Sequence, residues 1–487
     1  MLDKTAQKLE FKRQAAYVNG QWIAADSGKT LPVHNPATGE LIGTMPDCGK
    51  AETARAIEAA NAAFPAWRAK TAKERAKILH KLADLVEANA DTLGVLLTVE
   101  QGKSLAEAKG EVNFSAAYVR WFAEEAQRVY GDVIPSPWPG RRILVTKEPV
   151  GVVGAITPWN FPSSMIARKL GPALAAGCTI VIKPAAQTPY SGLAWGALAE
   201  MAGIPAGVVN VLTGSASAIG GELTSNPLVR KITFTGSTPI GKLLVEQSAK
   251  TLKKVSMELG GNAPFIVFDD ADVDRAIEGA MIAKYRNSGQ TCVCTNRFLV
   301  QSGIHDKFVE KLIAASNALK VGNGLEPGVQ MGPMVNHRRL AGVQKLIEDA
   351  VSRGATIATG GKPVEGKGFF FQPTVLTDVP ADAAILHEEP FGPVAPVAAF
   401  DDLDAALELA NSLPFGLAAY AYTDSAATAE KLIAGYEAGI LSINHCGGSL
   451  PQAPSGGFKE SGYGREGGPE GLEGYLLTKR VSHKLRP

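Results

Sequence analysis

The sequence predicts an α/β protein built from two domains. Residues 150–260 alternate between short apolar segments and helical segments, and residues 262–440 repeat this alternation. Continuous apolar strands separated by helices are typical of a parallel sheet that is covered on both faces. The length of 487 residues also exceeds one ordinary core and fits two or three domains.

The first alternation contains four strands and four helices. The strands are expected at Val150–Ile156, Thr179–Ile182, Val208–Leu212 and Lys231–Phe234, and the helices near residues 164–176, 191–202, 217–223 and 240–250. Ligands of parallel sheets bind beyond the carboxyl ends of the strands. The residues that follow these ends include Trp159 and Asn160, Lys183, and Gly236 and Ser237. We therefore expect a ligand site at this edge of the sheet.

The second alternation is longer and less regular. Its strands are expected at Phe265–Phe268, Phe298–Val300, near Thr356, and at Val394–Phe400, Leu417–Tyr422 and Gly439–Asn444, with helices at 304–318 and 337–352. Upstream of both alternations, a helix is expected from Lys50 to about Phe64. Another helix begins at a capping box formed by Thr71 and Glu74.

A strand-like run, Arg142 to Thr157, follows a cluster of prolines and lies outside the alternating pattern. The tail from Gly471 to Val481 is also strand-like and could pair with residues 142–148. These two segments predict an arm or edge ribbon.

Composition argues against several functional classes. The chain has 49 basic and 48 acidic residues without a long basic block, so a nucleic-acid or membrane surface has no electrostatic support. Its five cysteines are sparse and odd in number, which indicates a reducing compartment. The first residues lack the apolar core of a signal peptide, and no apolar run approaches the ~20 residues of a membrane helix. We therefore expect a cytoplasmic protein. No metal site is expected, because no two of the seven histidines have metal-ligand spacing on one helix face.

Cys292 is the candidate nucleophile. It lies on a Gly-containing turn between a helical stretch, Ala276 to Tyr285, and the apolar segment Phe298–Val300. A thiol on such a turn can face a cleft, and exposed backbone N–H groups can lower its pKa and bind developing negative charge. The alternative is a small buried hydrophobic residue, which is the commonest role of a free cysteine.

The segment Gly236–Lys242 matches the spacing of a phosphate-binding P-loop up to its last position, where Leu243 replaces the Ser or Thr that binds magnesium. It predicts a strand, a turn and a helix whose N-terminus binds a pyrophosphate without metal. A tight turn without ligand is the alternative. Leu243 also argues against a phosphate-transfer enzyme.

Glu258 is the candidate general base. It lies between a strand and two glycines, beside the apolar residues Met257 and Leu259. A carboxylate in apolar surroundings has a raised pKa and can accept a proton near neutral pH. The alternative is a solvated glutamate at the end of a strand.

Four stretches of the sequence resemble motifs of the aldehyde dehydrogenase superfamily and occur in its order. They are Pro158–Pro162, Met257–Asn262, Gly289–Cys292 and Glu388–Pro393. The segment Arg286–Cys294 is similar to the succinate-semialdehyde dehydrogenase branch. The resemblance covers essentially the whole chain.

This resemblance implies the aldehyde dehydrogenase fold and its division of the chain. A Rossmann-like NAD(P)-binding domain would comprise residues 1–128 and 150–258, and a catalytic domain residues 259–468. Residues 129–149 and 469–487 would form a β-arm for oligomerisation. A homodimer or homotetramer would follow.

The resemblance also implies the chemistry. Cys292 would attack the aldehyde carbon, and the Asn160 amide with the Cys292 N–H would hold the alkoxide of the thiohemiacetal. After hydride transfer to the nicotinamide, Glu258 would activate the water that hydrolyses the thioester. A member that passes the acyl group to CoA, and a non-catalytic protein on this fold, remain alternatives; the presence of all three residues disfavours the latter.

For the cofactor, the family implies binding by residues of three strand ends and of the Glu388–Pro393 motif. Thr157 and Trp159 lie in the first of these segments, Lys183 would hold the adenosine ribose, Gly236 and Ser237 the pyrophosphate, and Glu389 with Phe391 the nicotinamide ribose and ring. Ala186 stands where NAD-preferring members often have a glutamate that binds the ribose hydroxyls. We therefore expect NADP to be accepted, as well as or in preference to NAD.

For the substrate, the branch implies a distal carboxylate held by Arg168, Arg286 and Ser449. Arginine suits this role because a guanidinium binds a carboxylate bidentately. Each arginine could instead form a structural ion pair. The segment His445–Pro451 departs from the usual pattern of the branch, so a larger or aromatic aldehyde is the alternative to succinate semialdehyde.

Cys294 lies two residues after the nucleophile. In this branch a disulfide between two such cysteines can switch activity off, which predicts a redox response. Simple packing is the alternative.

Overall fold

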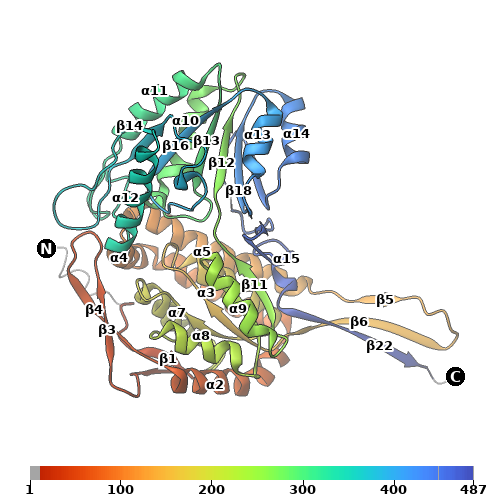
Figure 1. Ribbon diagram of the computed structural model, residues 1–487. Helices are drawn as coiled ribbons and strands as arrows, with labels where there is room; N and C mark the ends of the chain where they lie inside the picture. The colour runs from red at the N-terminus through yellow and green to blue at the C-terminus, as the bar shows by residue number, and fades with distance from the viewer. Residues whose placement is uncertain (1–10, 448, 486–487) are drawn as a thin grey trace.

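The protein contains two large β-sheets flanked by helices, one above the other in Figure 1, and a projecting arm. The computed structural model describes residues 11–447 and 449–485. The first residues, on which the expectation about a signal peptide rests, and Gly448 lie outside the described residues.

The first sheet has eight strands in the order β2-β1-β9-β8-β7-β10-β11-β21. Their bounds are β1 Ala16–Val18, β2 Gln21–Ile23, β7 Val152–Ile156, β8 Thr179–Lys183, β9 Val209–Val211, β10 Val229–Thr235, β11 Lys254–Glu258 and β21 Gly462–Tyr463. The five central strands are parallel, and β1, β2 and β21 run antiparallel to their neighbours. All four strands expected from the first alternation are present.

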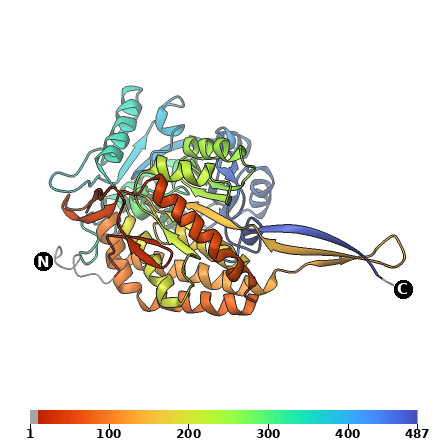
Figure 2. The same ribbon diagram turned by 90° about the horizontal axis from the view of Figure 1, so that it is seen from below.

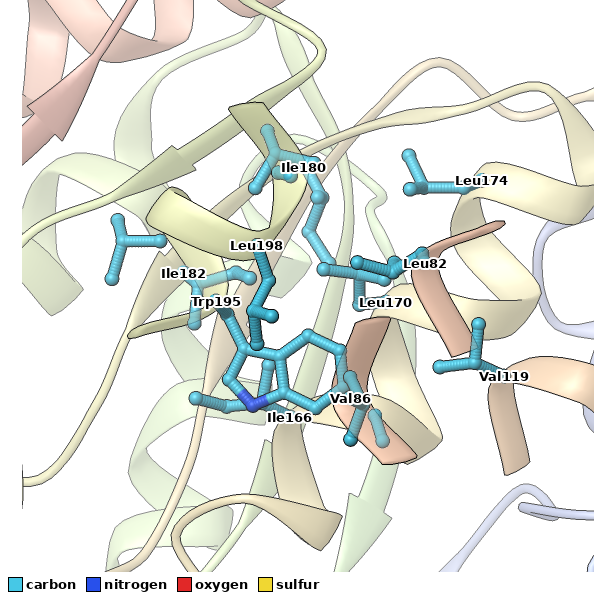
Figure 3. Close-up of a cluster of buried hydrophobic side chains, with 14 of the residues drawn as sticks. Leu82, Val86, Val119, Ile166, Leu170, Leu174, Ile180, Ile182, Trp195 and Leu198 are labelled. Carbon is cyan, nitrogen blue, oxygen red and sulfur yellow. The ribbon is translucent and has the colours of Figure 1, made fainter. Parts of the chain in front are cut away.

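Helices cover both faces of this sheet, as the continuous apolar strands predicted. They are α2 Lys50–Ala69, α3 Ala72–Ala88, α4 Ala90–Gln101, α5 Leu105–Glu125, α6 Ser164–Ala176, α7 Pro189–Ala202, α8 Ala216–Ser225 and α9 Thr238–Ala249. Ile180 and Ile182 of β8 face a core shared with α3, α5, α6 and α7, whereas Val181 faces a core shared with α2, α8 and α9. Figure 3 shows the first of these cores, where Trp195 and Leu198 lie beside Val86.

The second sheet has seven strands in the order β14-β15-β16-β13-β12-β18-β19. Their bounds are β12 Ala263–Val267, β13 Thr295–Gln301, β14 Thr356–Thr359, β15 Thr374–Thr377, β16 Val394–Phe400, β18 Ala418–Tyr422 and β19 Ile440–Ile443. The helices of this part are α10 Val273–Tyr285, α11 His305–Asn317, α12 His337–Ser352, α13 Leu403–Asn411 and α14 Ala426–Gly435. All its strand pairs are parallel except β14 with β15 among the described residues.

The arm is a three-stranded antiparallel sheet that extends away from the body (Figure 2). It consists of β5 Asp132–Ile134, β6 Arg141–Pro149 and β22 Leu476–Lys484. The pairing of β22 with β6 joins Leu476 to Pro149 and Lys484 to Arg141, so the predicted contact between the tail and residues 142–148 is present.

Two smaller ribbons complete the chain. They are β3 Thr30–His34 with β4 Leu41–Pro46, and β17 Phe415–Gly416 with β20 Phe458–Lys459. The domain boundaries inferred from the sequence stay predictions.

Three expectations about individual elements need correction. The run Arg142 to Thr157 is two strands, because the chain turns at Gly151 with φ +123° and passes from the arm into the first sheet. The tail from Gly471 begins as a short helix, α15 Glu470–Glu473, before β22. Helix α2 continues past Phe64 and contains Pro65 in its interior.

Candidate functional site

A cavity of about 370 Å³ lies where α5, α6 and the end of β11 meet the segment that follows α10. Its lining includes five residues that the sequence singled out: Cys292, Glu258, Arg168, Arg286 and Ser449. These residues are spread over almost 300 positions of the chain, so the fold alone brings them together. We take this cavity as the candidate active site.

The chain reaches Cys292 through a strained segment. Asn287, Ser288 and Gly289 are three consecutive buried residues with left-handed backbone, at φ +52°, +58° and +72°. This conformation costs about 1–2 kcal/mol for each non-glycine residue. Gly289 is required at its position, because a Cβ there would meet the backbone carbonyl of Gly392. The turn presents Cys292 to the cavity, and its side chain is partly exposed.

The electrostatic environment of Cys292 differs from the expectation. Burial, followed by the negative charges of Glu389 and Glu258, raises the pKa of the thiol to about 12. Arg168 and the backbone N–H of Cys292 act in the opposite direction but do not compensate. The backbone N–H thus lowers the pKa as predicted, but burial and the two carboxylates outweigh it. The thiol needs a base, or a nearby positive charge, to ionise near neutral pH.

Glu258 provides such a base. It is the last residue of β11, and it is 7% exposed. Burial, and after it the charge of Glu466, raises the pKa of Glu258 to about 8. Its Oε1 atom has no hydrogen-bond partner among the described residues. A buried carboxylate with a free oxygen and this pKa is suited to accept a proton in the cavity.

The carboxylate that acts on Glu258 belongs to a buried charge cluster. Glu466 lies 2.7 Å from Nε of Arg168 and 2.5 Å from Nζ of Lys169, and Lys169 also donates to Thr235 at 2.6 Å. The two cations keep the pKa of Glu466 low although its burial acts to raise it. Glu466 is therefore the ionised carboxylate of the pair, and Glu258 the group that titrates near neutral pH.

Asn160 follows β7 and is 4% exposed. Its side-chain Nδ2 donates to the backbone carbonyl of Gln290 at 3.0 Å, in the segment just before Cys292. Its own backbone carbonyl accepts hydrogen bonds from Lys103 Nζ at 2.7 Å and from Asn287 Nδ2 at 3.0 Å. The other hydrogen on Nδ2 of Asn160 is therefore available to a further acceptor, such as a bound ligand.

Arg286 and Arg168 differ in their partners. Arg286 is exposed beside the cavity, with its guanidinium 5.2 Å from the centre of the Phe161 ring, and it has no carboxylate partner among the described residues. Arg168 is buried and ion-paired with Glu466, as the alternative for each arginine foresaw. Ser449 lies at the same cavity and is partly exposed. Arg286 is thus the cation available to a substrate anion.

The residues expected at the cofactor lie at the carboxyl ends of the parallel strands. Ile156 is in register with Lys183, and Thr235 with Glu258, so the segments that follow β7, β8, β10 and β11 share one edge. Thr157 follows β7 directly and is buried. Beyond β10, the predicted strand, turn and helix are present, with Ser237 as the N-cap of α9.

Several features of this edge fit a dinucleotide. The Ser237 side chain is exposed and makes no capping hydrogen bond among the described residues, so the N-terminal N–H groups of α9 are open to an anion. Lys183 is 5% exposed, bonds to the carbonyl of Pro184 at 3.1 Å, and has no carboxylate partner in the described part of the chain. Burial lowers its pKa to about 8. Ala186 is exposed nearby in sequence and carries no charge.

The remaining cofactor candidates lie between this edge and the cavity. The Trp159 and Phe391 rings meet edge to face, with centroids 5.5 Å apart. Glu389 accepts a hydrogen bond from the Gly261 N–H at 3.2 Å, and burial raises the pKa of Glu389 to about 7. Glu389 also acts on the Cys292 thiol, so these groups connect the cofactor edge with the nucleophile.

Comparison with known proteins decides the family. The model of the aldehyde dehydrogenase family matches residues 22–481. The chain belongs to this family.

Individual relatives are similar over nearly the whole length of this aldehyde dehydrogenase. The glutarate-semialdehyde dehydrogenase of Pseudomonas putida is 57% identical over 467 residues, which cover 96% of this chain and 97% of the relative. The succinate-semialdehyde dehydrogenase of Escherichia coli K12, whose name specifies NADP(+), is 55% identical over 467 residues, with 96% and 97% covered. The crystal structure of succinate-semialdehyde dehydrogenase from Burkholderia pseudomallei is 54% identical with a TM-score of 0.96, and 98% of each chain is covered. The predicted family and fold are confirmed.

Sequence reasoning missed the charges that surround the site of this aldehyde dehydrogenase. Lys169 is adjacent to Arg168 in α6, but nothing in the local pattern shows that Glu466, 297 positions away, is its partner. Lys103 and Glu111 form a second buried ion pair at the cavity, with a distance of 2.6 Å. Lys169 lies in α6 and Lys103 in the loop between α4 and α5, and a buried lysine has no local signature in either place, so these pairs could be found only from the fold.

Cys294 of the aldehyde dehydrogenase is buried and recorded as a free thiol, as is Cys292. Its Sγ atom lies 3.5 Å from the carbonyl oxygens of Lys284 and Thr295. The disulfide with Cys292 stays a prediction. Within the described part of the chain, no cluster of three or more potential metal ligands occurs, and no helix is both long and apolar enough to cross a membrane.

Proposed function

We propose that this aldehyde dehydrogenase oxidises a semialdehyde with a distal carboxylate to the dicarboxylic acid, with NADP or NAD as hydride acceptor. The observation that carries this proposal is the composition of one cavity. It contains a nucleophile (Cys292), a base (Glu258) and an unpaired cation (Arg286). The proposed substrate is succinate semialdehyde or its longer homologue, glutarate semialdehyde.

The chemistry begins at Cys292. Because the thiol pKa is near 12 and that of Glu258 near 8, transfer of the thiol proton to Glu258 is unfavourable by itself, so Glu258 takes this proton in concert with the attack of sulfur on the carbonyl carbon. The carbonyl oxygen becomes an alkoxide, held by the free amide hydrogen of Asn160 and the backbone N–H of Cys292. Asn160 is a neutral donor, so it binds the alkoxide without protonating it. Donors aimed at such an oxyanion typically contribute 10²–10³ in rate.

The second half of the reaction releases the acid. The dinucleotide, when bound, supplies the acceptor for the hydride that leaves the thiohemiacetal carbon. Glu258 releases the thiol proton to solvent, and the ionised carboxylate then removes a proton from water as the water attacks the thioester carbon. The sulfur leaves as thiolate and regains a proton, which returns Cys292 to its starting state.

The chain's own residues fit a dinucleotide. The open N-terminus of α9 at Gly236 and Ser237 would hold the pyrophosphate, and Lys183 would hold the adenosine ribose. Glu389 and Phe391, with Trp159, would hold the nicotinamide end. The uncharged Ala186 beside an unpaired Lys183 favours NADP, since a 2′-phosphate meets a cation there and no carboxylate.

The relatives support the substrate class. Those named above are a glutarate-semialdehyde dehydrogenase and two succinate-semialdehyde dehydrogenases, whose named substrates carry a distal carboxylate. The exposed Arg286 can bind such a carboxylate, and Ser449 can donate a further hydrogen bond. Arg168 would contribute less than the sequence suggested, because Glu466 already neutralises its charge.

We also propose that the arm mediates self-association. Exposed apolar residues lie along it, including Val133 at 73% and Ile134 at 45% exposure. A three-stranded sheet with open edges is suited to pair with another chain. A homodimer or homotetramer is expected, and sedimentation of the purified protein would measure its mass. Cytoplasmic location likewise stays a proposal, supported by the sparse free cysteines.

Steady-state assays of the purified protein test the function. Reduced nicotinamide and acid product should form without CoA from succinate and glutarate semialdehydes, more efficiently than from butanal, pentanal or benzaldehyde. Cys292→Ser should be inactive. Acid that forms only with CoA would favour the acylating alternative, and a preference for benzaldehyde would favour the aromatic one. Absence of turnover with every aldehyde and both cofactors would refute the proposal.

A further inference from the structure

Asn287 connects the two parts of the site that handle the carbonyl oxygen. Its Nδ2 atom donates to the backbone carbonyl of Asn160 at 3.0 Å and to that of Gln290 at 3.2 Å. The side chain of Asn160 donates to the same Gln290 carbonyl at 3.0 Å. Asn160 is therefore tied at both its main chain and its side chain to the segment that carries the nucleophile.

Asn287 is itself held from three directions. Gln101 Nε2 donates to its Oδ1 at 2.9 Å, its N–H donates to Glu107 Oε1 at 2.9 Å, and Gln290 Nε2 donates to its carbonyl at 3.1 Å. The residue is 1% exposed and has φ +52°. Contacts from α4, from α5 and from Gln290 thus hold Asn287 in a strained conformation. Such a conformation persists only where the surrounding structure imposes it.

The direction of the free Asn160 hydrogen depends on these contacts. One hydrogen of the Asn160 amide is bound to the Gln290 carbonyl, so the position of that carbonyl sets where the other hydrogen points. Asn287 holds the Gln290 carbonyl, and together with Lys103 it holds the Asn160 main chain. An oxyanion donor is effective only when it is preorganised at the place where the charge develops.

We propose that Asn287 is a positioning residue that aims the Asn160 amide at the oxyanion above Cys292. The inference rests on the proposed function, in which Asn160 binds the alkoxide. It assigns Asn287 no contact with substrate or cofactor. The left-handed backbone at this residue accompanies an arrangement in which one side chain reaches both carbonyls.

The main test replaces Asn287 by glycine, which adopts positive φ freely and removes the amide together with its Cβ. We expect kcat for the semialdehyde to fall about 10- to 100-fold, since small misplacements of a catalytic group have effects of this size. The KM for NADP should stay within about twofold of wild type. Ser288→Ala is the matched control, because Ser288 shares the left-handed segment but donates to Gly332 at 2.8 Å. It should keep kcat within about twofold.

A double-mutant cycle separates positioning from general support of the fold. Asn160→Ala should lower kcat about 10²–10³-fold. If Asn287 acts through Asn160, adding Asn287→Gly to Asn160→Ala should lower kcat by less than about threefold, because coupled residues are not additive. Losses that multiply in the double variant would overturn the proposal. Wild-type kcat in Asn287→Gly would overturn it as well.

A second substitution and a second measurement cover the case of poor folding. Asn287→Asp keeps the shape and the contact with Gln101 but replaces the donor by an acceptor that faces two carbonyls, so it should lose kcat as the glycine variant does. Alkylation of Cys292 by iodoacetamide should proceed within about twofold of the wild-type rate in the soluble variant. A much slower or faster alkylation would show that the nucleophile itself has moved, which contradicts the proposal.

The same assays distinguish this inference from the function on which it rests. Wild-type protein without aldehyde oxidation would refute the proposed function. Active wild type with an equally active Asn287→Gly would refute the positioning role alone.

Discussion

Glu466 and Glu258 are two buried carboxylates of which one carries the charge and the other carries the proton. Glu466 is ion-paired with Arg168 and Lys169, and its negative charge adds to burial in raising the pKa of Glu258 to about 8. Environments that push the pKa values of two acids apart assign them different roles. In the proposed function, the acid with the raised pKa is the base of the reaction.

The first prediction follows from that pKa. Glu258 accepts a proton only when it is ionised, so kcat should rise with pH through about pH 8 and level off above it. Glu258→Gln should lower kcat about 10²–10⁴-fold and remove the rise of kcat with pH, which is the limb of the pH profile that Glu258 causes. The measurement is kcat against pH between about 6 and 10, with the cofactor saturating. A flat profile in the wild type would contradict the assignment.

The second prediction concerns Glu466. Glu466→Gln removes a negative charge near Glu258 and leaves Arg168 and Lys169 uncompensated, and both changes favour the ionised form of Glu258. The limb should therefore move to lower pH, by about one unit or more. A limb that stays in place or moves upward would show that the two carboxylates do not interact. Thermal unfolding of this variant controls for loss of the buried ion pairs, which is expected to be destabilising.

The third prediction concerns the nucleophile in the absence of cofactor. Burial and then Glu389 are the largest causes of the high pKa of Cys292. Glu389→Gln removes a negative charge, so the thiol pKa should fall and iodoacetamide should react faster at pH 8. Because the assay contains no cofactor, any role of Glu389 in cofactor binding does not affect it. Cys292→Ser provides the background rate, and an unchanged rate in Glu389→Gln would refute the electrostatic link.

The fourth prediction tests the carboxylate clamp. Arg286→Ala should raise KM for succinate semialdehyde about tenfold or more, because a charge-assisted hydrogen bond is lost. KM for butanal, which has the same chain length without the carboxylate, should change by less than about twofold. Arg286→Lys keeps the charge but not the bidentate geometry and should lie between. Equal effects on both aldehydes would exclude the clamp.

Some features of the fold and of the site could be predicted from the sequence, and others could not. The central strands were predictable because they are buried on both faces and contain short continuous apolar runs, such as residues 180–182 in β8. The sequence singled out Cys292 and Glu258, which line one cavity in the structure, because each lies at a glycine-containing turn next to a strand or helix. Such local patterns can be recognised in the sequence without knowledge of the fold.

The electrostatics of the site were not predictable in the same way. The sequence suggested that the turn lowers the pKa of Cys292, but burial, and after it the carboxylates of Glu389 and Glu258, raise it. Arg168 fitted a substrate role by position, yet its partner Glu466 lies in the C-terminal segment. Charge–charge contacts between distant segments leave no local pattern, so only the folded structure shows them.

The fifth prediction concerns the redox response of Cys294. Its Sγ atom faces the carbonyls of Lys284 and Thr295, so a disulfide with Cys292 requires the Cys294 side chain to leave both contacts. Cys294→Ala should keep kcat within about twofold, since the residue has no role in the reaction itself. If the disulfide forms, peroxide should inactivate wild type in a way that dithiothreitol reverses, whereas Cys294→Ala should be inactivated irreversibly as its Cys292 oxidises further. Identical behaviour of the two proteins would leave Cys294 as a packing residue. Mass spectrometry of the peroxide-treated wild type would confirm the pairing through a loss of two hydrogens from the peptide that contains both cysteines.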